Sequence, residues 1–240
     1  MTDAAPRPTE RVRTTWLRRS EAEYASAALS LQLAHWLTEI AGPPELIYAA
    51  MDIARDEFGH AQHSAEVARA AGATAMPQID RSLLVAPRDP RNPVEEDLLA
   101  LLLRNFCVGE TLAVPLFREM RAGSTETAAR AVLDLILVDE ARHREFSWIA
   151  LEWLLTDSTA LRGAAARLTP AIVRRRVDTC STPLDRLLGD TVTPEERGWG
   201  LISAGSYRTI VLAALERDVW PRFARLGVGR DDGNPTDRGG

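Results

Sequence analysis

The sequence predicts an all-helical fold: a four-helix bundle with a long crossover between its second and third helices and additional C-terminal helices. Over most of the 240 residues, apolar side chains recur at three- and four-residue steps, with little of the alternation typical of strands. These segments are rich in Ala, Leu, Arg and Glu, most of which favour helices. Glycine and proline divide them into two hairpins, joined by a proline-containing segment at 72–92 that lacks helical periodicity.

The first predicted hairpin joins helices over 16–41 and 45–71. The Gly-Pro-Pro sequence at 42–44 ends the first helix, and Gly72 ends the second, because Gly and Pro favour turns over helix interiors. The two helices are therefore expected to lie antiparallel.

The second predicted hairpin joins helices over 94–121 and 126–156 through a short turn at 122–125. Simple up-down bundles have short loops throughout. Two hairpins joined by one long connection are instead typical of four-helix bundles that contain a crossover. The crossover is therefore expected to connect the two halves of one bundle, which covers 16–156.

Three further helices are predicted after the bundle, over 158–178, 182–189 and 194–226. Thr193 followed by Pro194 is typical of a helix start with Pro at its first position. These helices are too few to form a second core, so 16–227 is predicted to be a single domain. Residues 1–15 and 228–240 contain little to bury and are expected to be flexible tails.

The charge and cysteine content exclude several function classes. The formal net charge is -5, and all 29 basic residues are Arg. Nucleic-acid binders usually present a basic face, so no nucleic-acid partner is expected, although Arg174, Arg175 and Arg176 form a local patch. Cys107 and Cys180 are too few for a disulfide framework or a four-cysteine metal site. A reducing, cytoplasmic location is therefore expected.

No membrane-spanning segment is expected from the sequence. The longest apolar stretch begins at Leu98 and is interrupted by Arg104 and Glu110, so it falls short of the roughly 20 apolar residues that a bilayer span requires. The N-terminus carries Asp3 and lacks the apolar segment of a secretory signal.

The second and fourth predicted bundle helices carry the same motif, Asp-Glu-x-x-His, at 56–60 and 139–143. Residues three apart lie on the same face of a helix. Glu57 with His60, and Glu140 with His143, can therefore each offer one carboxylate oxygen and one imidazole nitrogen to a metal ion. A single Glu-x-x-His is a weak signal, but two copies on paired helices are more specific.

The two partner helices supply further carboxylates at comparable depth. Glu110 lies on the third helix and Glu23 on the first, with Glu21 as an alternative to Glu23. Apolar neighbours on the same helix faces place these groups inside the bundle. Burying several carboxylates is tolerable only if cations neutralise them, so a pair of divalent metal ions is predicted between the helices.

This pattern resembles the ferritin-like di-iron carboxylate proteins, which have a Glu on each of two helices and Glu-x-x-His on the other two. The resemblance covers about 16–156. It implies two Fe ions, with Fe/Mn or Mn as alternatives, bridged by Glu57 and Glu140. The implied metal ligands, which also form the implied catalytic centre, are Glu23, Glu57, His60, Glu110, Glu140 and His143.

The aspartates of the two motifs are predicted to support the imidazoles. Asp56 and Asp139 are one residue from the ligand face, so each can accept a hydrogen bond from the His of the opposite motif. The Asp-Glu-x-Arg-His form of the fourth helix resembles bacterial di-iron monooxygenases and ribonucleotide reductase small subunits. The alternative is that both aspartates are ordinary surface charges.

A substrate pocket is expected beside the metal ions. Gly109 before Glu110 and Pro115 after it are expected to distort the third helix and to make room there. From this helix, Phe106, Cys107 and Val114 are predicted to line the pocket. His35 and His63 fall outside the metal-facing positions and are not expected to be ligands.

The resemblance implies a non-haem oxygenase or oxidase that uses O2 as cosubstrate to oxidise a small organic molecule, by hydroxylation, N-oxygenation, desaturation or C-C cleavage. The additional helices favour this function, because they can form a pocket wall. An external electron donor is expected, because the chain lacks the Cys-x-x-Cys pair of rubrerythrins. An iron-handling ferroxidase, a peroxide-scavenging protein and a metal-free interaction domain stay open, as does a homodimer.

Overall fold

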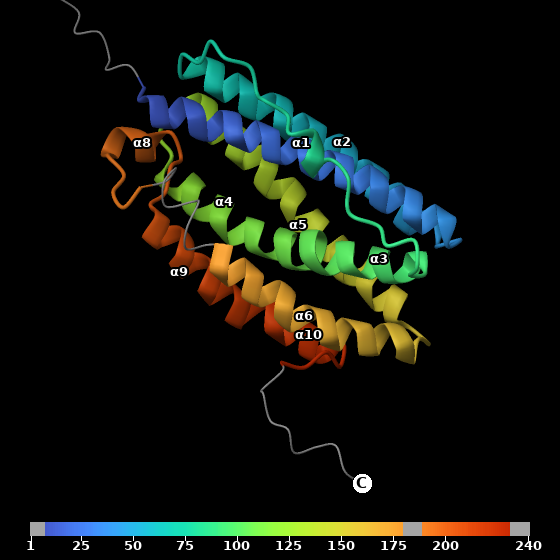
Figure 1. The fold of residues 1–240 in the computed structure, drawn as a ribbon. Coiled ribbons are helices and arrows are strands. Elements are labelled where there is room, and N and C mark those ends of the chain that lie inside the picture. The colour runs from blue at the N-terminus through green and yellow to red at the C-terminus, as the bar shows by residue number, and fades with distance from the viewer. Residues whose placement is uncertain (1–7, 180–188, 231–240) are drawn as a thin grey trace, which may run out of the picture.

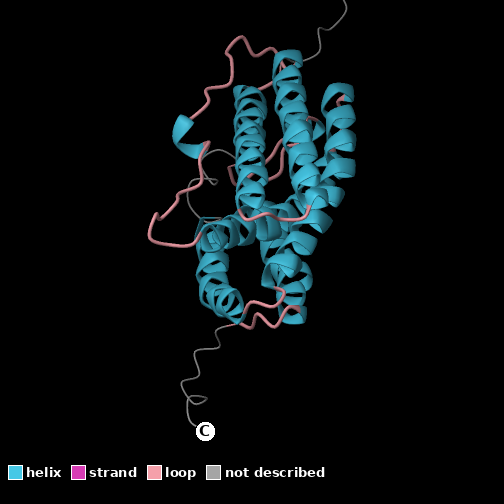
Figure 2. Cartoon of the chain, turned by 90° about the vertical axis from the view of Figure 1, so that its right-hand side faces the viewer, coloured by secondary structure: helices cyan, strands magenta, loops and turns pink. Residues whose placement is uncertain are grey.

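The structure is a computed structural model that describes residues 8–179 and 189–230. Over these residues the chain is helical and contains no strand, as Figure 2 shows. It forms a helical bundle in which a first hairpin packs on a second, and further helices cover the opposite side of the second hairpin (Figure 1). The prediction of an all-helical fold is confirmed.

The first hairpin consists of α1 (Glu10–Glu39) and α2 (Pro44–Ala70), which pack against each other along their length (Figure 1). Gly42 lies in the turn between them. A Cβ at this position would lie 3.0 Å from the carbonyl oxygen of Leu37 and 3.2 Å from the Trp153 ring, so the close approach of these elements requires glycine.

The start of α1 differs from the prediction, which assigned 1–15 to a tail. The helix begins at Glu10 because the Thr9 hydroxyl accepts a hydrogen bond from the backbone amide of Val12 and caps it. Val12 and Trp16 are both fully buried. The first turns of α1 therefore belong to the core.

The second hairpin consists of α3 (Val94–Leu101), η2 (Leu102–Glu110) and α4 (Thr111–Gly123), followed by α5 (Thr127–Leu155). The first three follow one another without a break and form one continuous helical stretch, where a single helix was predicted over 94–121. The middle part, η2, is a π-helix, in which hydrogen bonds span five residues instead of four. The distortion predicted from Gly109 and Pro115 is therefore present at Gly109, in a π-helix that ends at Glu110, whereas α4 stays α-helical around Pro115.

The crossover lies along the first hairpin and contains one short 3-10 helix, η1 (Arg81–Leu83). The Gln32 side chain of α1 donates a hydrogen bond to the Ala86 carbonyl at 3.2 Å and accepts one from the Ala86 amide at 2.7 Å. These two bonds attach the otherwise irregular segment to the bundle.

The additional helices are α6 (Thr159–Thr179), α8 (Pro194–Gly198), α9 (Ala204–Ala214), η3 (Leu215–Val219) and α10 (Trp220–Arg225). Of these, α6 packs on α3 and η2, and α9 packs on α4. The helix predicted over 182–189 lies almost entirely outside the described residues.

The single helix predicted over 194–226 is wrong, because the chain turns between α8 and α9. Gly200 has a φ of 84°, a conformation that favours glycine, and a Cβ there would lie 3.0 Å from the Leu133 side chain. The tail predicted from 228 also begins too early. Val228 is 1% exposed, and its amide donates a hydrogen bond to the Phe223 carbonyl.

One helical segment, Val94–Gly123, is long and apolar enough to cross a membrane, because its most apolar window of 18 residues has a mean hydropathy of 1.4. Here 67% of its most apolar window is buried against other parts of the protein. A core helix of a globular bundle has the same composition, so this segment is weak evidence for a membrane span.

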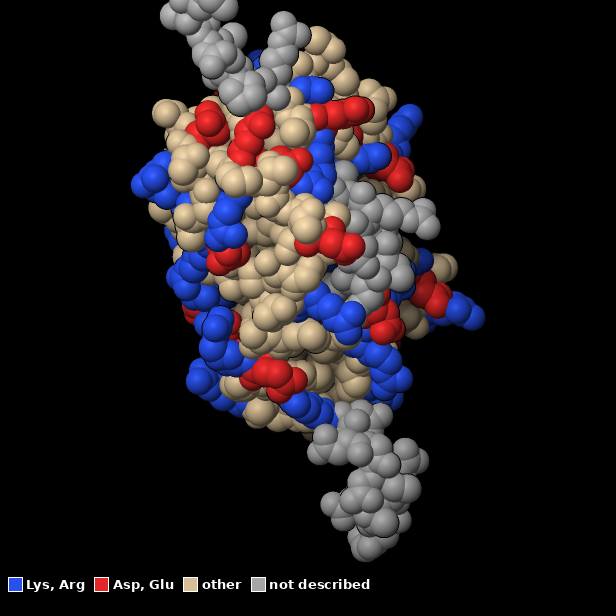
Figure 3. All heavy atoms as spheres, turned by 90° about the vertical axis from the view of Figure 1, so that its left-hand side faces the viewer, with Lys and Arg blue, Asp and Glu red and all other residues tan. Residues whose placement is uncertain are grey.

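On the face shown in Figure 3, arginine and acidic side chains are mixed among uncharged surface.

Glu196 joins the start of α1 to α8. Its carboxylate accepts hydrogen bonds from the Thr9 hydroxyl, the Arg11 guanidinium and the Thr193 amide, and the Thr193 hydroxyl accepts from the Glu196 amide in return. Burial raises the pKa of the Glu196 carboxyl, but these hydrogen bonds outweigh it and hold the pKa below its usual value.

Replacing Glu196 with alanine is expected to lower the free energy of unfolding by about 2 kcal/mol, because the partly buried ion pair with Arg11 and the hydrogen bond from the Thr193 amide are lost together. The difference from wild type should shrink as the pH falls through the lowered pKa, because a protonated Glu196 no longer stabilises the folded state. Urea denaturation at several pH values measures both effects. Glu152→Ala, an exposed change on α5, is the control and should be nearly neutral.

Candidate metal centre

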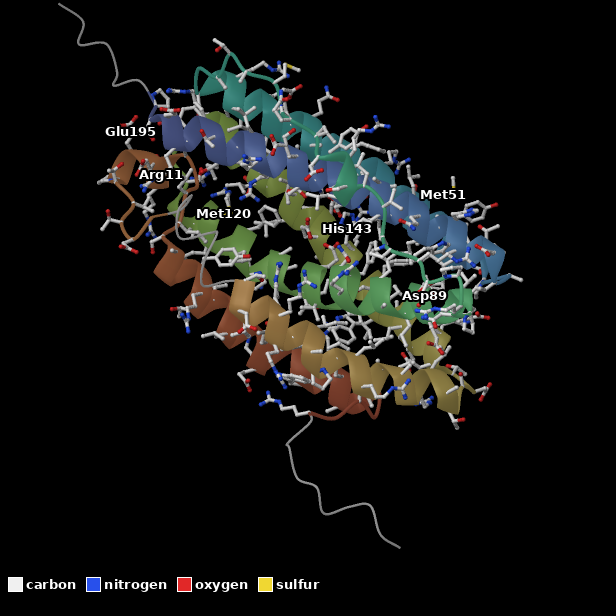
Figure 4. All side chains as sticks on the ribbon, in the orientation of Figure 1. Arg11, Met51, Asp89, Met120, His143 and Glu195 are labelled. Atoms are coloured by element: carbon white, nitrogen blue, oxygen red, sulfur yellow. The ribbon has the colours of Figure 1, made fainter. Side chains whose placement is uncertain are left out.

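Six side chains from four helical elements meet in the interior of the bundle. Each is at most 8% exposed, although four of them are carboxylates. Figure 4 labels one of them, His143, in the middle of the bundle. They are Glu23 from α1, Glu57 and His60 from α2, Glu110 at the end of η2, and Glu140 and His143 from α5. The structure therefore brings together all six residues that the sequence pattern singled out.

The six residues form two overlapping groups. Glu23 and His60 join Glu57 and Glu140 in one group, and Glu110 and His143 join the same two glutamates in the other. Within each group the possible ligand atoms all lie within 4.8 Å of one another, a spacing that suits coordination of one ion. Two shared carboxylates and four unshared ligands, namely two glutamates and two histidines, are what a pair of bridged metal ions requires.

The two imidazoles are oriented by aspartates from the opposite helix. His60 Nε2 lies 3.0 Å from Asp139 Oδ2, and His143 Nε2 lies 3.4 Å from Asp56 Oδ2. These are the crosswise contacts predicted from the sequence. Each aspartate can accept a hydrogen bond from Nε2–H, and in that tautomer Nδ1 presents a lone pair to a metal ion bound in the cluster.

Four atoms of the cluster are buried and have no hydrogen-bond partner among the described residues. They are Glu57 Oε2, Glu140 Oε2 and the Nδ1 atoms of His60 and His143. His143 Nδ1 lies 3.1 Å from Glu57 Oε1, but without the alignment of a hydrogen bond. Buried polar atoms are rarely left unpaired, so these four unpaired atoms point to an ion that binds between them.

The ionisation of the cluster also depends on cations. Burial and the charge of Glu57 raise the pKa of Glu23 to about 8 and that of Glu110 to about 7. Burial and Glu110 raise the pKa of Glu140 well above its ordinary value. Burial raises the pKa of Glu57 as well, but contacts with the two imidazoles outweigh it and lower the pKa to about 2. Four ionised carboxylates at this place therefore need positive charge beside them.

Sequence reasoning missed the role of Arg142. Its guanidinium donates hydrogen bonds to both Asp56 and Asp139 and so links the two aspartates at the edge of the cluster, although 58% of its side chain is exposed. The sequence does contain a signal for this role. Arg142 lies within the motif, three residues after Asp139, so the two side chains share a helix face.

Replacing Asp139 with asparagine is expected to weaken metal binding by about tenfold to 100-fold, because the His60 imidazole loses the carboxylate that fixes its orientation and raises its basicity. Competition with a chelator of known affinity measures the change. Asp134→Asn is the matched control on the same helix, because Asp134 binds Arg121 at the surface and lies away from the cluster. Equal weakening of metal binding in both variants would show that Asp139 does not orient the His60 imidazole.

A cavity of about 780 Å³ lies beside the cluster, and all four buried glutamates border it. From η2 and α4 it is lined by Asn105, Val108, Gly109 and Ala113, among others. The sequence prediction of Phe106, Cys107 and Val114 as lining residues is wrong. All three are buried in the core, and the Cys107 thiol donates to the Ser147 carbonyl.

The π-helix explains the error at Phe106, whereas Val114 lies after it, in α4. In an α-helix, the residue one turn before Glu110 is Phe106, four positions earlier. In a π-helix the equivalent turn spans five positions, so Asn105 takes the place beside the cavity. Nothing in the hydrophobic pattern distinguishes the two geometries.

Other residues considered as ligands have different roles. Glu21, the alternative to Glu23, pairs with Arg18 at 2.8 Å and accepts a hydrogen bond from the Gln78 amide, so it lies outside the cluster. His35 is exposed, and His63 pairs with Glu66 at the surface, both as predicted.

Comparison of this chain with protein-family models, with curated proteins and with solved structures finds no match. The arrangement of the buried cluster and its cavity is therefore the basis for assigning a function.

Proposed function

We propose that this chain is a ferritin-like di-iron protein that activates O2 to oxidise a small organic molecule. The observation that carries the proposal is the pair of overlapping buried groups that share Glu57 and Glu140. Each group adds one further glutamate and one histidine, so the two halves are equivalent in composition. Two hairpins joined by a crossover that runs along the bundle support the ferritin-like assignment.

The donor set fits iron. Carboxylate oxygens and imidazole nitrogens suit iron and manganese, whereas the absence of a thiolate from the cluster disfavours softer metals. Glu57 and Glu140 would bridge the two ions, and Glu23, His60, Glu110 and His143 would each bind one. When bound, a pair of reduced irons supplies the electrons that O2 activation requires.

The protein supplies the geometry and the environment of this chemistry. Asp139 and Asp56 hold the imidazoles with Nδ1 facing the cluster, and Arg142 holds both aspartates. The surrounding helices keep the six ligands almost completely out of water. Exclusion of water strengthens electrostatic interactions inside the site and protects reactive species from side reactions.

The cavity favours an organic substrate over iron storage or peroxide removal. A volume of about 780 Å³ accommodates a molecule of the size of many metabolites, and the cavity borders the carboxylates directly. Neither peroxide nor iron needs such a space. The chain has only two cysteines and no Cys-x-x-Cys sequence, so electrons would come from an external donor.

Anaerobic loading with Fe(II), followed by exposure to O2, tests the proposal. We expect about two irons per chain and rapid O2 consumption that develops the absorption of an oxo-bridged di-iron centre. Fewer than about one iron or manganese per chain would favour a metal-free helical domain. Turnover of many irons per chain with formation of a mineral would favour a ferroxidase instead.

A further inference from the structure

The cavity beside the cluster has a positively charged border as well as an acidic one. Five arginines line it, from α1, η2 and α6. They are Arg18, Arg19, Arg104, Arg175 and Arg176. The same cavity therefore presents both guanidinium groups and the four glutamates to an organic molecule.

Two of these arginines already have side-chain partners. Arg18 pairs with Glu21, and the Arg104 guanidinium donates to the Asn105 side chain at 2.9 Å. Both are exposed at the cavity rim. They need no ligand to satisfy them.

Arg19 and Arg176 differ, because each has a buried Nε without a hydrogen-bond partner in the part of the chain that the structure describes. The Arg19 guanidinium also stacks on the Phe117 ring, 4.7 Å from its centroid, and contacts the Met120 sulfur. An arginine held in this way presents donors in a fixed geometry. A carboxylate is the partner that guanidinium groups bind best, through two parallel hydrogen bonds.

The charge balance of the cluster strengthens this argument, and this step rests on the proposed function. The carboxylate paired with Arg19 is that of Glu23, whose Oε1 lies 4.0 Å from Nη1 of Arg19. Two divalent ions bring four positive charges to the four buried carboxylates and so neutralise them. Arg19 would then lack a counter-charge in a partly buried position, which is unfavourable unless an anion supplies it.

The rest of the cavity wall is mostly apolar. Its side chains come from α4, α6 and the turn before α9, and include Leu116, Phe117, Leu168, Ile172, Leu201 and Ile202. We propose that the cavity binds an organic acid, with its carboxylate on the guanidinium groups of Arg19 and Arg176 and its apolar body between these side chains. The substrate class of the proposed oxidation is thereby narrowed to small, largely apolar carboxylic acids.

Binding of matched acids and amides to protein loaded with Mn(II), which avoids reaction with O2, tests this inference. The probes are octanoate and 4-phenylbutyrate, each with its uncharged amide, and the readout is calorimetry. We expect at least one acid to bind about tenfold or more tightly than its amide, as charge-assisted hydrogen bonds predict. Arg176→Gln should remove this preference, and the separate variant Arg19→Gln should do the same. Arg174→Gln, an exposed change on the same helix that lies outside the cavity lining, should not.

The controls separate this inference from the proposed function. Metal analysis and circular dichroism of each variant establish that it is folded and holds two ions. Equal affinities for acid and amide, no binding of either acid, or an acid preference that survives in both variants would overturn the inference while leaving the metal centre intact. An acid that binds the metal ions directly would produce the last of these results. Failure of the wild-type protein to bind metal would instead overturn the proposed function.

Discussion

Replacing Glu57 with alanine is expected to abolish the proposed two-metal centre by a single substitution. Glu57 belongs to both groups of ligands, so its loss removes one ligand from each ion. Bound iron should fall from about two to fewer than one per chain, and O2-dependent activity should fall by at least about 100-fold. Metal analysis, the absorption spectrum and O2 consumption measure these effects.

The matched control for this prediction lies on the same helix. His63 and Glu66 are also an acid and a histidine three residues apart, but they pair at the surface. The double variant His63→Ala, Glu66→Ala should keep two irons and the wild-type spectrum. Helical content measured by circular dichroism should change little in either protein. A Glu57→Ala protein that retains two irons would remove Glu57 from the ligands and contradict the shared-carboxylate arrangement.

Removal of metal is expected to lower the thermal stability of the wild-type protein strongly. An ion that binds only the folded state contributes about 4 kcal/mol when present at a thousand times its Kd. For a chain of this size, each kcal/mol changes Tm by roughly 2–4 °C, so a total difference of roughly 8–16 °C is expected for one such ion. Calorimetry of the metal-loaded and chelator-treated protein measures it.

The same experiment on the Glu57→Ala variant provides an internal control. Its Tm should depend little on metal, because neither ion keeps a complete set of ligands. If metal raised the Tm of wild type and of this variant equally, binding would occur elsewhere on the protein. That result would separate non-specific metal binding from occupation of the buried cluster.

The long helices could be predicted closely where the chain carries clear stop signals. The sequence places the second helix at 45–71 and the fourth at 126–156, and the structure has them at Pro44–Ala70 and Thr127–Leu155. The ends of α2 are determined locally by Pro43, Pro44 and Gly72, whereas α5 ends at Leu155 with no glycine or proline beside it. The break at Gly200 was missed because a positive φ and a tight contact with Leu133 depend on tertiary packing.

The six clustered residues could be predicted because helical spacing and buried charge are both visible in a sequence. Glu57 and His60 share a helix face whatever packs against them, and the repeated motif on α5 identifies the partner. The cavity lining could not be predicted, because the change from α to π geometry in η2 alters which side chains face the cluster. Arg142 was missed because its two partners come from different helices.

The π-helical stretch also makes the number of residues before Glu110 important, apart from their identities. Removing one residue between 102 and 109 would allow this stretch to close as an ordinary α-helix, in which each residue advances by about 100°. A π turn holds one residue more than an α turn, so α3 and Glu110 would keep about the same faces after this deletion. Closing the stretch as an α-helix without the deletion would instead turn α3 by about 100° relative to Glu110. Homologous sequences with this centre should therefore either keep this number of residues and the π-helix, or lack one residue and have an α-helix here.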